Sequence, residues 1–199
     1  GLFYVMNKMK LNLDDKILFF DTDTYFHKSP LPLFELIKFN QAVFYLNEGL
    51  IHKRKRFNVY LENLKDKKID YDGNFYELSK NSEVWGALMI GLMPNMISSL
   101  EWADKLMIKF FEIVPSHTIE QFALSEILLK KYKIVEGKSY VSLYSTRRKK
   151  EHAVKILSKF FKENSSLSIG QKISLAQKFK IRRPFLTLIK QKIFQSQRR

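Results

Sequence analysis

The sequence predicts an α/β domain in which helices flank a mixed sheet, followed by a basic helical C-terminal region. Two observations predict the domain, assigned to residues 1–150: short apolar runs alternate with amphipathic segments, and 45% of the 199 residues are hydrophobic. Such a chain can build one sizeable core of strands and helices. A third observation sets residues 151–199 apart from this domain as a basic region. No Asp or Glu follows Glu163, whereas nine Lys or Arg follow it.

The first elements follow from the spacing of apolar residues. Residues 2–13 carry them near helical spacing and are expected to end a helix. The continuous apolar run 17–20 suits a strand buried on both faces, with a short helix from about Pro32. Residues 42–46 are expected to form a second strand. The polar stretch 50–82 is interpreted as an excursion or mobile flap.

The second half of the domain continues the alternation. Residues 84–91 form a third apolar run, and its glycines indicate close approach of another backbone or a ligand. Thr118-Ile119-Glu120-Gln121 is a capping box that predicts a helix start. The other expected elements are a helix at 95–113, strands near 133–136 and 140–144, and helices at about 147–163, 168–180 and 185–195.

Composition narrows the class of protein. Cysteine is absent, which excludes disulfides and thiolate metal sites. No run approaches the roughly 20 apolar residues of a membrane span, and the N-terminus has no signal-peptide features. We therefore expect a cytoplasmic protein. The lack of an initiator Met indicates a fragment or a processed chain.

The net charge of +15 points to anionic partners. Residues 181–194 mix bulky apolar side chains with cations, a composition typical of contact with an anionic membrane surface. A solvated helix that packs one apolar face explains the same residues equally well. The basic run 52–56 is interpreted as a solvated face rather than a phosphate site. No nucleic-acid motif is present, so nucleic acid is not an expected partner.

Asp21-Thr22-Asp23 is the most specific motif. Because side chains alternate across a strand, Asp21 and Asp23 are expected to point to the same side. They follow an apolar strand at its carboxyl end, where open α/β sheets bind ligands. Carboxylates this close repel each other unless a cation or a proton lies between them. The pair predicts a divalent metal that holds phosphate; the alternative is a polar turn.

Residues 17–37 resemble the D-x-D region of GT-A-type glycosyltransferases, which are nucleotide-diphospho-sugar transferases. Two later segments agree in order: Trp85-Gly86-Ala87-Leu88-Met89-Ile90-Gly91 is similar to the family segment that lines acceptor and diphosphate, and Glu120-Gln121 is similar to its acidic-Gln helix start. The resemblance covers about residues 14–150. That family places a βαβ nucleotide-binding half before the D-x-D strand, so the resemblance implies a C-terminal part of such an enzyme.

The resemblance implies that a sugar moves from a nucleotide-diphosphate donor to a glycan or lipid-linked acceptor. Asp21, Thr22 and Asp23 would contact the donor. Asp23 would ligate Mn²⁺ or Mg²⁺, and Asp21 would orient the water shell of the metal or the donor ribose. These ions favour carboxylate and phosphate oxygens.

The resemblance also implies the acceptor side of the site. Trp85, Gly86 and Ala87 would line the acceptor. An inverting reaction needs a base for the acceptor hydroxyl, and Glu120 is the candidate, with Glu83 second. A retaining reaction would need none, and Glu120 would then only complement a helix dipole.

Two other classes of function stay open. A haloacid-dehalogenase-type phosphatase would use Asp21 as nucleophile and Asp23 as general acid, but it needs a later acidic pair, and no Asp follows Asp104. A non-catalytic basic module that binds a membrane or a protein partner is the second alternative.

Overall fold

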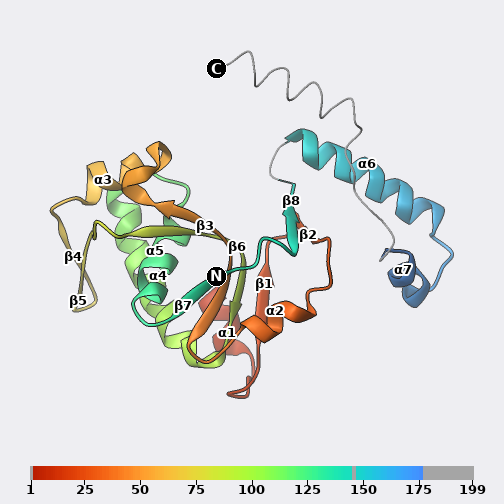
Figure 1. Ribbon diagram of the computed structural model, residues 1–199, viewed down its shortest axis with the longest axis horizontal. Helices are drawn as coiled ribbons and strands as arrows, with labels where there is room; N and C mark the ends of the chain where they lie inside the picture. The colour runs from red at the N-terminus through yellow and green to blue at the C-terminus, as the bar shows by residue number, and fades with distance from the viewer. Residues whose placement is uncertain (1, 145–146, 177–199) are drawn as a thin grey trace, which may run out of the picture. The chain divides into compact units, whose positions relative to one another are not determined.

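The computed structural model describes residues 2–144 and 147–176 and confirms a mixed α/β protein (Figure 1). The chain divides into two compact units, residues 1–142 and 143–199, near the boundary expected after residue 150. Within the described residues, the first unit contains a four-stranded mixed sheet. Its strands, in spatial order, are β1 (Ile17–Phe20), β6 (Glu83–Leu92), β3 (Gln41–Leu50) and β7 (Lys133–Glu136).

Strand direction decides which ends of these strands meet. β6 runs antiparallel to both β1 and β3, whereas β3 and β7 are parallel. The carboxyl ends of β1, β3 and β7 therefore lie at the same end of the sheet as the first residues of β6. This end of the sheet carries the motifs singled out in the sequence.

β1 is an edge strand of the described sheet, and its side chains are half-buried or exposed, so the prediction of a strand buried on both faces is wrong. Its only described strand partner is β6. Phe19 and Phe20 remain 40% and 46% exposed. An apolar run indicates hydrophobicity but not how far other elements cover each side chain, which is why the burial of this strand was overestimated.

The two faces of the sheet bury alternate residues against different helices. Ala42 and Phe44 belong to the larger core, with α1 (Leu2–Lys8), α4 (Ile97–Ile113) and α5 (Ile119–Leu129). Val43 belongs to a smaller core with α2 (Leu31–Leu36). Beside it, β2 (Thr24–Phe26) pairs with β8 (Val141–Leu143). Figure 1 shows α4 and α5 side by side along the sheet.

Glycine packing is tightest in the smaller core. A Cβ added to Gly91 would lie 2.7 Å from Ile37 Cδ1, and one added to Gly137 would overlap Met89 Cε. The glycines of the third apolar run were expected to mark close approach of a backbone or a ligand, whereas the close neighbours of Gly91 are the side chains of Ile37 and Val43. The capping box is not formed, because the Thr118 hydroxyl bonds to the hydroxyls of Tyr60 and Ser116 instead of the helix backbone.

Residues 50–82 leave the sheet between β3 and β6, as expected of an excursion, but their apolar residues pack into the larger core. Tyr60 and Tyr76 are no more than 1% exposed. Asp72 and Gly73 adopt positive φ (62° and 77°) in a tight hairpin turn. The elements are η1 (Ile51–Lys53), η2 (Lys55–Phe57), α3 (Asn58–Leu64), β4 (Lys68–Tyr71) and β5 (Asn74–Glu77).

The second unit contains α6 (Arg147–Glu163) and α7 (Ile169–Ala176), and a short 3-10 turn, η3 (Pro94–Met96), precedes α4 in the first. The helix expected at 147–163 is confirmed. The one expected at 168–180 is described only to Ala176, and the one expected at 185–195 lies outside the described residues. None of the described helices is long and apolar enough to cross a membrane.

Glu126 makes the stability of the fold depend on pH. Its side chain is 8% exposed, it accepts a hydrogen bond from Ser82 Oγ (2.9 Å), and burial raises its pKa above the ordinary 4.5. The folded state therefore holds a proton that the unfolded state releases. Its contribution to the free energy of unfolding is complete below pH 4.5 and is lost as pH rises through the raised pKa.

We expect Glu126→Gln to gain stability relative to the wild type as pH rises from 4.5, because the amide has no proton to lose. Urea denaturation of both proteins across pH 4.5–8 measures this difference. Glu62→Gln, at an exposed position of α3, is the matched control and should follow the wild type. A constant difference between Glu126→Gln and the wild type would show that Glu126 does not control the pH dependence.

Candidate functional site

The Asp21-Thr22-Asp23 turn and the Trp85-Gly86-Ala87 segment adjoin at one end of the sheet. The Asp21 N–H donates to the Leu88 carbonyl (2.9 Å), directly beyond the last pair of β1 and β6, Phe20 and Met89. Two motifs far apart in the sequence are thus joined by a backbone hydrogen bond.

Both aspartates lie in a tight turn rather than on a strand. β1 ends at Phe20, and the Thr24 N–H and hydroxyl both donate to the Asp21 carbonyl (3.0 and 2.5 Å). Strand alternation therefore does not apply to these side chains. Asp21 is exposed and Asp23 half-buried, so at least one carboxylate is open to a ligand.

The described residues contain no metal site built from protein ligands alone. Among the described residues, no group of three or more His, Asp or Glu could hold an ion. Mg²⁺ is commonly bound through one or two carboxylates together with substrate phosphates. Asp21 and Asp23 could supply such carboxylates, and a diphosphate would complete the coordination.

Gly86 of β6 is buried beside a carboxylate. A Cβ at this position would lie 3.2 Å from Glu48 Oε1 and 3.6 Å from the Tyr45 ring. Trp85 is 7% exposed, and its ring meets Phe44 edge to face at 6.4 Å. The indole is thus mainly a core side chain, while Gly86 and the half-buried Ala87 lie nearer the turn.

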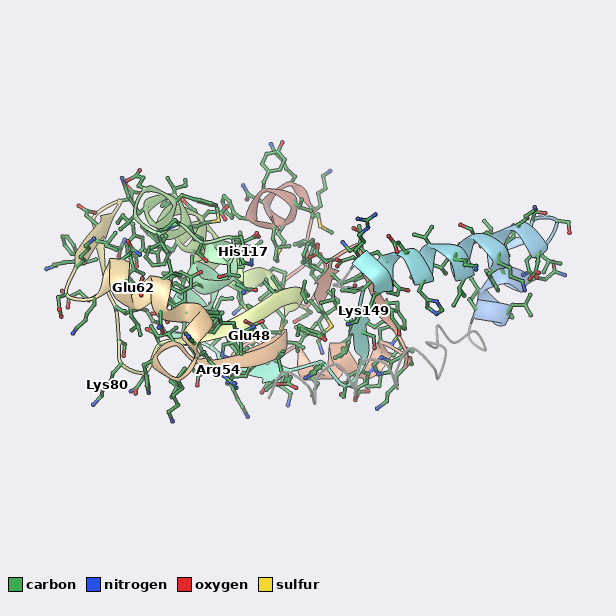
Figure 2. All side chains as sticks on the ribbon, turned by 90° about the horizontal axis from the view of Figure 1, so that it is seen from above. Glu48, Arg54, Glu62, Lys80, His117 and Lys149 are labelled. Atoms are coloured by element: carbon green, nitrogen blue, oxygen red, sulfur yellow. The ribbon has the colours of Figure 1, made fainter. Side chains whose placement is uncertain are left out.

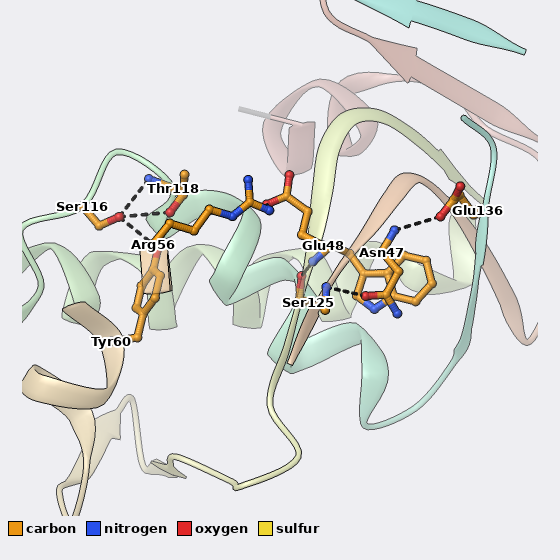
Figure 3. A network of polar contacts seen from close by, with 10 residues as sticks. Asn47, Glu48, Arg56, Tyr60, Ser116, Thr118, Ser125 and Glu136 are labelled. Atoms are coloured by element: carbon orange, nitrogen blue, oxygen red, sulfur yellow. Dashed lines mark hydrogen bonds and ion pairs between the residues drawn. The ribbon is translucent and has the colours of Figure 1, made fainter. Parts of the chain in front are cut away.

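Asn47 ties three strands together at this end of the sheet (Figure 3). Its N–H donates to Glu136 of β7 (3.2 Å), and its side-chain amide donates to Glu83 of β6 (3.2 Å). Glu83 also accepts from Trp85 Nε1 (3.1 Å), and the Trp85 N–H donates to Ser125 of α5 (2.9 Å). The polar groups of the site are therefore fixed before any ligand binds.

Glu48 is a candidate functional residue that sequence reasoning missed. Its side chain is 15% exposed and pairs with Arg56 at 2.7 Å (Figure 3). Burial raises the Glu48 pKa, and the nearby Arg56 charge partly opposes this rise. Its only sequence signal is a position just after an apolar run, in Asn47-Glu48-Gly49.

Glu120 lies in the first turn of α5 with an exposed side chain. Its helix is linked to β6 through Ser125, which accepts from the Trp85 N–H and donates to the Gln121 carbonyl (2.6 Å). This link places the start of α5 near β6 but does not join Glu120 to the aspartate turn.

Comparison with known proteins does not assign a function to this chain. No family model, curated protein or solved structure matches this chain. Any functional conclusion therefore rests on the motifs of the sequence and on the geometry that brings them together.

Proposed function

We propose that this protein is a metal-dependent glycosyltransferase that moves a sugar from a nucleotide-diphosphate donor to a glycan or lipid-linked acceptor. One observation carries the proposal: the backbone bond from Asp21 to Leu88 sets the D-x-D turn beside Gly86 and Ala87. A donor at the turn and an acceptor at β6 would then be neighbours.

The aspartate turn would hold the donor. Asp21 and Asp23 would share Mn²⁺ or Mg²⁺ with the donor diphosphate, and Thr22 would contact the donor from the exposed turn between them. The ion, when bound, supplies positive charge that stabilises the departing nucleoside diphosphate. The acceptor would lie along the Trp85-Gly86-Ala87 segment of β6.

A carboxylate near Gly86 would accept the acceptor proton if transfer inverts the sugar. The acceptor oxygen forms a bond to the sugar C1, the bond from C1 to the diphosphate oxygen breaks, and the hydroxyl proton passes to the base. Glu48 is the best placed, because it lies against Gly86 and burial raises its pKa toward the range that suits a base. Glu120 and Glu83 are the other candidates.

Calorimetric titration with UDP-sugars and GDP-sugars tests this proposal. We expect a donor to bind when Mn²⁺ is present and not when EDTA replaces it. Mn²⁺ alone should bind weakly, since two carboxylates leave most of its coordination to the donor phosphates. Asp14→Asn, at an exposed acid before β1, is the control and should bind normally. Donor binding that is unchanged by EDTA would contradict the proposal.

The basic C-terminal region is proposed to contact an anionic membrane, where a lipid-linked acceptor would lie. α6 exposes Val154 and Phe161 among its cations. This combination is typical of helices that lie on a membrane surface. The remainder of the expected segment, residues 181–194, lies outside the described residues.

A further inference from the structure

A basic pocket opens at the same end of the sheet as the aspartate turn. It has a volume of about 570 Å³, within the usual range for small-ligand sites. Three parts of the chain line it: the end of β3, the η1–η2 segment, and the residue after Gly137. The lining residues are Leu46, Asn47, Glu48, Lys53, Arg54, Lys55, Arg56 and Lys138.

The charges of the basic pocket are mostly uncompensated. Glu48 is its only acid among five cations, and Arg56 pairs with it at 2.7 Å. Within the described residues, no ion pair is formed by the other four cations. Five cations around one cavity outnumber Glu48 and the two acids bonded to the lining residue Asn47, Glu83 and Glu136, which leaves a positive potential that a cleft focuses.

The basic run is held in place on both sides. Ile51 and Phe57 flank it and are 0% and 1% exposed. The Ile51 N–H donates to the Ser82 carbonyl (3.0 Å), and the Phe57 N–H donates to the Arg54 carbonyl (2.8 Å). The side chains of this run are exposed, as its interpretation as a solvated face predicts, while its backbone is anchored to the core on both sides.

Gly49 provides the space for Arg54. Its φ of +96° favours glycine, and a Cβ there would lie 3.3 Å from Arg54 Nε. The side chain of Arg54 therefore passes close to Gly49 although the residue is exposed, and Figure 2 shows Arg54 near Glu48. Lys138 approaches from the other side, after Gly137, whose N–H donates to the Phe44 carbonyl (2.8 Å).

The position of the basic pocket separates it from the aspartate turn. β6 lies between β1 and β3, and their ends pair with different parts of it: Phe20 lies opposite Met89, whereas Leu50 lies opposite Glu83. The aspartate turn and the basic pocket are therefore separated by two strand spacings, about 10 Å, and by an offset along the strands. Gly86 and Ala87 lie on the intervening strand. An anion in the pocket would therefore be on the opposite side of the proposed transfer position from a donor diphosphate at Asp21 and Asp23.

We infer that the basic pocket binds an oxyanion group of the acceptor, a phosphate or a carboxylate, and that this protein glycosylates anionic acceptors. The inference rests on the proposed function and names its acceptor class. Oxyanions match the donors of Arg and Lys, and Arg can bind them through two parallel hydrogen bonds. The donor diphosphate has the same chemistry, so the experiment must distinguish the two sources.

Pyrophosphate is a suitable probe, titrated into the full chain by calorimetry with EDTA present. EDTA suppresses metal-dependent binding at the aspartate turn. We expect the wild type to bind pyrophosphate with an affinity that weakens as NaCl is raised. In the double variant Lys53→Gln/Arg54→Gln this affinity should fall at least tenfold. The control Lys65→Gln/Lys67→Gln removes two exposed cations that do not line the pocket. It should bind like the wild type.

The outcomes separate the pocket from the proposed function. Absent wild-type binding, or an equal loss in both double variants, would overturn the pocket as an anion site. In a second titration, with UDP or GDP and Mn²⁺ saturating, pyrophosphate should still bind. Displacement by the nucleotide would assign the pocket to the donor and overturn the acceptor inference. Failure of the transferase proposal appears separately, as absent metal-dependent donor binding.

Discussion

Replacement of Asp23 by Asn is expected to reduce sugar transfer about a thousandfold while the fold stays intact. Asn keeps the shape of the side chain but removes the charge that would hold the metal against the donor diphosphate. A loss of roughly 4 kcal/mol of transition-state stabilisation corresponds to this factor. The release of nucleoside diphosphate from a donor that binds the wild type, with Mn²⁺ present, measures the rate.

The fold should tolerate this change because Asp23 lies in a half-buried turn outside the sheet. Asp14→Asn removes the same charge from an exposed position and should leave the rate unchanged. Circular dichroism of the variants checks that the turn is not needed for folding. Transfer that survives both EDTA and Asp23→Asn would exclude the proposed role of the aspartate turn.

Phe122→Ala is expected to lower the free energy of unfolding by about 3–5 kcal/mol, the usual range for a buried Phe. Phe122 is 0% exposed, and its ring lies 4.3 Å from Tyr60, 5.5 Å from Phe110 and 6.5 Å from Tyr76, measured between ring centroids. Truncation would leave a cavity between α5, α4 and the 50–82 segment. Urea denaturation measures the loss.

Phe111→Ala is the matched control, since that ring is 62% exposed on α4. It should change stability by no more than about 0.5 kcal/mol. A loss below about 1 kcal/mol for Phe122→Ala would mean that residues 50–82 do not share a tightly packed core with α5.

Regular elements could be predicted wherever hydrophobic periodicity is strong. The run at 42–46 lies within β3, the helix expected at 95–113 is α4 from Ile97, and the strand near 133–136 is β7. The helices and strands within residues 50–82 were not predicted, because the buried aromatic residues of this segment are spaced among many charged residues. Tyr71-Asp72-Gly73-Asn74 contains the Asp-Gly turn signal of a hairpin, which could have been recognised.

The site was predictable only where it is local in sequence. The D-x-D turn and the Trp85-Gly86-Ala87 segment were found as short motifs. The basic pocket was not, because Lys138 meets the run 53–56 only through the parallel pairing of β3 with β7. The surroundings of Glu48 also come from other parts of the chain. Arg56 forms an ion pair with it, and Gly86 has no side chain at the place where Glu48 lies.

The edge position of β1 has a consequence for how this chain behaves at high concentration. A strand edge with apolar neighbours such as Phe19 and Phe20 presents backbone donors and acceptors that can template a foreign strand. The same strand edge would pair with a strand from elsewhere in a longer polypeptide or from a second copy of the chain. Association at this edge should therefore limit the solubility of the protein. At the basic pocket, by contrast, mutual repulsion of cations keeps copies apart.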